Sequence, residues 1–152
     1  MYRRILVTLE NSPADVTIID HIRKLARHTG ASLVLIHVAD GWVARNIQQL
    51  KLRESEEMRA DIAYLEQVCA DLRSAGLAAE ALLAAGTPGK EIAEAAEREG
   101  CDLIAMATHG HKLVGDLVRG SVANDVRHRS MIPVLLVRHR KDGDETKLGH
   151  GD

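Results

Sequence analysis

The residues best suited to chemistry lie in a polar, glycine-containing segment that follows the apolar run 103–107. Gly110 is followed ten residues later by Gly120-Ser121-Val122, where we expect a short helix from Ser121 to about residue 129. Glycines let the backbone approach a phosphate, and amides at a helix start offer N–H groups at the positive end of the helix dipole. The Ser121 hydroxyl could bond to a phosphate oxygen or serve only the helix backbone. The segment predicts an anion site, although the spacing alone is a weak signal and no Walker sequence accompanies it.

Five short apolar runs, at residues 4–9, 32–38, 80–83, 103–107 and 133–137, are typical of buried parallel strands. Segments with helical periodicity separate them. We expect one helix capped by Ser12 and ended by Gly30, and another capped by Thr87 and ended by Gly100. Between these two, a long helix should end at Gly76 and bury one face made of Met58, Ile62, Leu65, Cys69 and Leu72.

This alternation predicts an α/β fold: a single doubly wound, Rossmann-like sheet of five parallel strands with helices on both faces. The common strand order for such a sheet is 3-2-1-4-5, in which the order reverses between strands 1 and 4. Ligands bind at the carboxyl ends of the strands that flank this reversal. The loops after those two strands, residues 8–12 and 107–120, carry the unusual polar and glycine content of the chain. We therefore expect the site to lie between them.

Composition limits the classes of partner. The chain has 152 residues, 45% hydrophobic and 28% charged, which fits one domain at residues 1–138 and a charged tail at 139–152 that we expect to be disordered. Only 2% of residues are aromatic and the net charge is -2, so neither nucleic acid nor a membrane surface is an expected partner. No apolar run is long enough to span a bilayer, and we expect a cytoplasmic protein. Cys69 and Cys101 should be buried, reduced thiols.

One family resemblance covers residues 3–138. The pattern Gly-x2-Gly-x9-Gly-Ser/Thr before a Pro-Val-Leu-x-Val strand is the ATP-binding signature of universal stress proteins. The chain reads Ala107-x2-Gly110-x9-Gly120-Ser121 and then residues 133–137 as Pro-Val-Leu-Leu-Val. Further matching landmarks are Ile5-Leu6-Val7 with Ser12, Leu35 to Val38, Gly86-Thr87-Pro88 and Asp102-Leu103-Ile104. The chain thus resembles a universal stress protein of the ATP-binding type.

The resemblance implies a stress-response regulator that binds ATP, alone or with Mg²⁺, and that is not an enzyme. It places adenine near the end of the first strand and the Val38 backbone, the ribose beside residues 106 and 107, and the phosphates on the later glycines. The implied site residues are Thr8, Leu9, Glu10, Val38, Met106, Ala107, His109, Gly110, Gly120, Ser121 and Val122. Two positions depart from the pattern: Ala107 replaces the first glycine, and Glu10 replaces an aspartate. These two departures allow a second interpretation, in which the protein is a nucleotide-free homodimeric protein-interaction module of the same fold.

The same residues allow other roles. His109 and His111 could bind a metal, but no third ligand is evident nearby, so we expect no metal site. Glu10 or His109 could act as a base in hydrolysis, but no recognisable spacing supports this, and we expect no catalytic residues. An apolar last strand at a sheet edge requires a partner. The resemblance implies a homodimer formed by antiparallel pairing of this strand, through Val134, Leu135, Leu136 and Val137.

Overall fold

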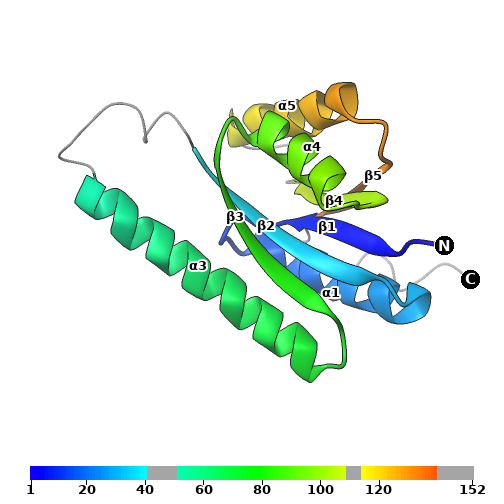
Figure 1. Ribbon diagram of the computed structural model, residues 1–152. Helices are drawn as coiled ribbons and strands as arrows, with labels where there is room; N and C mark the ends of the chain where they lie inside the picture. Colours follow the sequence, from blue (N-terminus) through cyan, green and yellow to red (C-terminus); the bar gives the residue numbers. More distant parts are fainter. Residues whose placement is uncertain (41–50, 109–113, 140–152) are drawn as a thin grey trace, which may run out of the picture.

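The computed structural model describes residues 1–40, 51–108 and 114–139. Parallel strands alternate with helices along this part of the chain (Figure 1). In chain order the elements are β1 (Arg4–Thr8), α1 (Ala14–Thr29), β2 (Ser32–Asp40), α3 (Lys51–Ser74), β3 (Ala79–Gly86), α4 (Pro88–Arg98), β4 (Leu103–Thr108), α5 (Val114–Arg129) and β5 (Val134–Arg138).

The five strands form one parallel sheet in the order β3-β2-β1-β4-β5. The predicted fold class and strand order are therefore confirmed. β1 is central, and Val7 pairs with Leu35 of β2 on one side and with Ala105 of β4 on the other. Because all strands are parallel, the carboxyl ends of β1 and β4 lie side by side where the order reverses.

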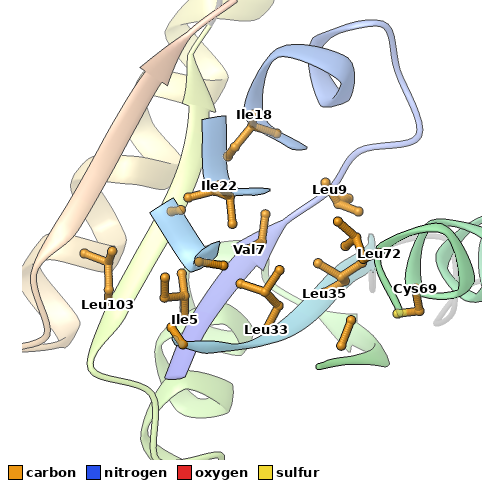
Figure 2. Close-up of a cluster of buried hydrophobic side chains, with 14 of the residues drawn as sticks. Ile5, Val7, Leu9, Ile18, Ile22, Leu33, Leu35, Cys69, Leu72 and Leu103 are labelled. Atoms are coloured by element: carbon orange, nitrogen blue, oxygen red, sulfur yellow. The ribbon is translucent and has the colours of Figure 1, made fainter. Parts of the chain in front are cut away.

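Alternating residues of the central strands face two separate cores, because successive side chains of a strand point to opposite faces. Ile5 and Val7 belong to a cluster with side chains of α1 and α3, part of which is drawn in Figure 2. Leu6 and Ile104 belong to a second cluster with side chains of α4 and α5. Helices thus cover both faces, with α1 and α3 on one side and α4 and α5 on the other (Figure 1).

The buried face of α3 differs from the predicted one. Leu65, Cys69 and Leu72 are buried as expected, but Ile62 is 44% exposed. Tyr64 and Val68 instead pack against the cluster beneath α1 and α3. A stripe that advances by three or four residues fits two adjacent helix faces almost equally well, and only the position of α3 on the sheet selects between them.

Strand lengths and helix caps also differ in detail. β3 runs to Gly86, beyond the predicted residues 80–83, because the longer β2 pairs with it as far as Asp40. Neither Ser12 nor Thr87 makes the predicted side-chain cap bond. Gly30 does end α1, with a left-handed φ of 76°. Gly89 of α4 faces α5 so closely that a Cβ there would collide with the Asp125 side chain, which accounts for glycine at this position.

Both cysteines are buried and unpaired, as predicted. Burial raises the pKa of both thiols, that of Cys101 to about 11. Each therefore stays protonated near neutral pH and acts as a small apolar core residue rather than as a nucleophile.

Candidate functional site

The loop after β1 is built around one buried carboxylate. Asp15, at the start of α1, is 1% exposed and accepts hydrogen bonds from three backbone N–H groups, those of Glu10 (3.0 Å), Asn11 (2.8 Å) and Ser12 (3.4 Å). The Ser12 hydroxyl instead donates to Glu10 Oε2 over 3.2 Å. Ser12 therefore does not cap α1 as predicted. The carboxylate of Asp15 accepts from the loop N–H groups instead, because an ionised acceptor bonds more strongly than a hydroxyl.

α3 reaches the same loop through two polar side chains. The Tyr64 hydroxyl donates to Asp15 over 2.6 Å, and Asn11 Nδ2 lies 3.4 Å from Asp61 Oδ1. Burial, followed by the hydrogen bond to Asp15 and the charge of that carboxylate, raises the pKa of Tyr64 well above its usual range. Asn11 holds a left-handed φ of 58°, a conformation that asparagine tolerates better than most residues. The loop that follows β1 is therefore held in place by α1 and α3 together.

The backbone of Leu9 is bonded on both sides. Its N–H donates to the Ile36 carbonyl over 2.8 Å, and its carbonyl accepts from His37 Nδ1 over 2.8 Å. The opposite ring nitrogen of His37 lies 3.2 Å from Asp61 Oδ2. The Leu9 side chain is buried in the core beneath α1, so it can offer a ligand only its backbone.

The structure brings three of the predicted site residues together on the α4 and α5 side of the sheet. Met106 is buried there, and Val38 and Val122 pack against the same cluster. Ala107, next along β4, packs against the opposite cluster. The methyl group that replaces the expected glycine hydrogen is thus on the other face of the sheet from Met106. Thr8 and Glu10 are partly buried at the end of β1.

The start of α5 was predicted wrongly. The helix begins at Val114, so Gly120, Ser121 and Val122 lie within it rather than at its first turn. Backbone N–H groups inside an α-helix bond to carbonyls four residues earlier, and the predicted row of unbonded amides is therefore absent from these three residues. Ser121 presents its side chain on the exposed surface of the helix. His109 and Gly110 lie outside the described residues.

Asp15, His37, Asp61 and Tyr64 were not predicted as parts of the site. Asp61 and Tyr64 are three residues apart, one helical turn, and a polar pair on a buried helix stripe could have been the signal. Within the described ranges, no cluster of three or more His, Cys, Asp or Glu side chains is arranged as a metal site would be. None of the helices in these ranges is both long and apolar enough to cross a membrane.

Known proteins share this sequence pattern and this fold. The sequence profile of the universal stress protein family matches residues 1–138. The chain belongs to the universal stress protein family. Universal stress protein MJ0577 of Methanocaldococcus jannaschii is 24% identical over 160 residues, which cover 92% of this chain and 97% of the relative. The solved structure of MJ0577 matches with a TM-score of 0.77 at 25% identity, over 93% of this chain and 99% of that chain.

Two further solved universal stress proteins share the fold. One is a complex with cAMP, with a TM-score of 0.68 at 21% identity over 91% of this chain and 98% of the other. The second is an Archaeoglobus fulgidus protein in complex with dAMP, with a TM-score of 0.63 at 21% identity over 90% of this chain and 98% of the other. At 21% identity, the similarity to these two structures establishes that this chain has the same fold as they do.

Proposed function

We propose that this universal stress protein binds an adenine nucleotide, with ATP as the preferred ligand, and that it acts as a regulator and not as an enzyme. The observation that carries the proposal is the sheet order, which sets the polar loop after β1 beside the end of β4 at the reversal point. Two proteins of the same fold were solved with cAMP and with dAMP, both adenine nucleotides.

The adenosine part would lie across the ends of β1, β2 and β4. In this proposal the backbone around Leu9, the Glu10 carboxylate and the Val38 backbone face the base, and residues 106 and 107 border the ribose. The position of Ala107 supports the arrangement, since its methyl packs toward α1 and away from the side of Met106. Replacing the usual glycine by alanine therefore leaves the Met106 side of the sheet unobstructed by that methyl.

The phosphates would extend toward Gly110 and the segment Gly120-Ser121-Val122, with the Ser121 hydroxyl donating to a phosphate oxygen. Because α5 starts at Val114, the amides of these residues become available only if residues 114–119 leave the helix. The proposal therefore includes a shortening of α5 on nucleotide binding. Mg²⁺, if it binds, would be held mainly by the phosphates, as is usual for this ion.

Isothermal titration with ATP, with and without Mg²⁺, tests the proposal, with GTP as the control for the base. We expect saturable binding of ATP and weaker binding of GTP. In NMR spectra, the ¹³Cα chemical shifts of residues 114–119 should move away from helical values when ATP binds. Ser121→Ala should weaken ATP binding about tenfold, because a hydrogen bond to a charged group is lost. Asn124→Ala, at an exposed position of the same helix, should bind like the unaltered protein.

Absence of heat and of thermal stabilisation at millimolar ATP would contradict the proposal, since a ligand bound by the native state must stabilise it. The nucleotide-free interaction module would then be the better description. Turnover of ATP above background, lost in Ser121→Ala, would contradict the assignment as a non-enzymatic regulator.

We also propose that the protein forms a homodimer by antiparallel pairing of β5. Within the described sheet β5 is an edge strand, and Leu136 is 46% exposed. Ile104 N–H donates to the Pro133 carbonyl and His139 N–H to the Thr108 carbonyl, so odd-numbered residues of this segment face β4. By the two-residue period of a strand, the peptide groups of Val134, Leu136 and Arg138 face outward, where a second copy could pair.

Leu136→Pro tests the dimer sharply. It removes an outward-facing N–H and leaves the β4 pairing intact, and proline is tolerated on edge strands. We expect the dissociation constant of the dimer, measured by sedimentation, to rise at least about tenfold. An edge hydrogen bond and the fit of the paired strands are both lost. Leu136→Val keeps the N–H and an apolar side chain and should remain dimeric. An unaltered protein that is monomeric at all concentrations would overturn the proposal.

A further inference from the structure

The His37 ring lies between two hydrogen-bond acceptors. Nδ1 is 2.8 Å from the Leu9 carbonyl oxygen, and Nε2 is 3.2 Å from Asp61 Oδ2. A carbonyl oxygen and an ionised carboxylate can only accept, so both ring nitrogens must carry a proton if both bonds are to form. Only the imidazolium form of histidine has both protons. The geometry therefore fits a positively charged His37.

These two bonds act on the loop proposed to contact the nucleotide. The first fixes the Leu9 carbonyl, one peptide before Glu10. The second fixes Asp61, which also accepts from the Asn11 side chain, while the Asn11 N–H donates to Asp15. His37 therefore holds the loop at Leu9 directly and at Asn11 through Asp61.

The Asp61 carboxylate is in direct contact with the ring. On β1 the ring meets the Leu9 carbonyl, and on β3 the residue paired with His37 is the apolar Leu83. From α1, Asp15 is engaged by the loop N–H groups, and from α3 the Tyr64 hydroxyl donates to Asp15. Loss of the His37 proton would therefore place a ring lone pair against the Asp61 carboxylate or against the Leu9 carbonyl.

We propose that His37 is a positioning residue for the loop after β1, and that the affinity for adenine nucleotides falls as rising pH removes the second proton of the His37 ring to solvent. This inference rests on the proposed function. Neutral imidazole can satisfy one of its two acceptors but not both, so the loop loses one of its two fixed points.

The test compares ATP affinity from about pH 6 to about pH 8.5 in the unaltered protein and in His37→Gln, whose side chain does not titrate. The ratio of the two affinities cancels the protonation of ATP and of all other groups. We expect the affinity of the unaltered protein, divided by that of His37→Gln, to fall by about threefold to tenfold across the range, the net contribution of one ordinary hydrogen bond. His21→Gln, at an exposed position of α1, should follow the unaltered protein. A ratio that does not change with pH would overturn the inference.

A second variant and a ligand-free measurement separate this inference from the proposed function. Asp61→Asn keeps a neutral partner for His37 and should flatten the pH dependence while retaining the fold. In the ligand-free protein, ¹⁵N NMR should show both His37 nitrogens protonated at low pH, and the Glu10 and Asn11 amide signals should follow the same titration. If those amides follow His37 but ATP binds at no pH, the proposed function fails and the positioning role stands. If they do not follow it, the positioning role is wrong even where ATP binds.

Discussion

Asp15→Ala is expected to lower the free energy of unfolding by about 3–5 kcal/mol, one of the two largest effects of a single substitution that we anticipate in this protein. The carboxylate accepts from three backbone N–H groups and from the Tyr64 hydroxyl. Each buried donor left without a partner costs about 1–3 kcal/mol, and entry of water into the partly exposed loop reduces the sum. Urea unfolding followed by circular dichroism measures the change.

The control is Asp20→Ala on the same helix, where an exposed carboxylate pairs with Lys24 over 3.1 Å. An exposed pair four residues apart contributes only about 0.3–0.5 kcal/mol. Hydrogen exchange should also accelerate at the amides of residues 10–12 in Asp15→Ala and not in the control. Equal losses of stability in the two variants would show that the carboxylate is not the centre on which this loop is built.

Leu65→Ala is expected to cost about 2.5–4 kcal/mol of unfolding free energy, whereas Ile62→Ala should cost less than about 1 kcal/mol. Leu65 is 1% exposed, and its truncation leaves a cavity beneath α3. Ile62 is 44% exposed and loses little contact when shortened. Both substitutions remove most of an aliphatic side chain from the same helix, so helix propensity contributes similarly to both. Thermal and urea unfolding of the two variants provide the comparison.

This pair also decides which face of α3 packs on the sheet. The apolar stripe read from the sequence includes both residues and predicts similar losses. The structure turns the helix so that Tyr64, Leu65 and Val68 face the sheet. A large loss in Ile62→Ala with a small loss in Leu65→Ala would contradict that rotation and, with it, the contact between Tyr64 and Asp15.

Much of the architecture could be predicted because each local signal agreed with the others. Apolar runs with helical segments between them admit few solutions other than a parallel sheet with right-handed crossovers. The strand order follows from these connections, and the prediction of a site between β1 and β4 rests on that order. Gly30 and Pro88 lie where the sequence predicts, since glycine favours a left-handed φ and proline lacks an N–H that the first helical turn does not use.

The first residue of α5 was not predicted correctly from local sequence signals. Gly120 was predicted to precede the helix, because a glycine inside a helix costs about 1 kcal/mol relative to alanine. The structure nevertheless continues the helix through Gly120 and as far back as Val114. Extending a helix that is already nucleated costs far less than starting one, and residues 121–129 supply that nucleus. Glycine spacing therefore did not fix the boundary.

By itself, the sequence determined the fold class and the strand order, because periodicity and chain connectivity are local properties with few global solutions. Only the tertiary structure decided which face of α3 is buried and that the Tyr64 hydroxyl bonds to Asp15, the carboxylate that holds the loop after β1. It likewise placed His37 between Leu9 and Asp61. The contacts of His37 with Asp61 and with Leu9, and the contact of Tyr64 with Asp15, join residues 24, 28 and 49 positions apart. No local pattern encodes such partners, since they meet only when the packed sheet brings β1, β2 and α3 together.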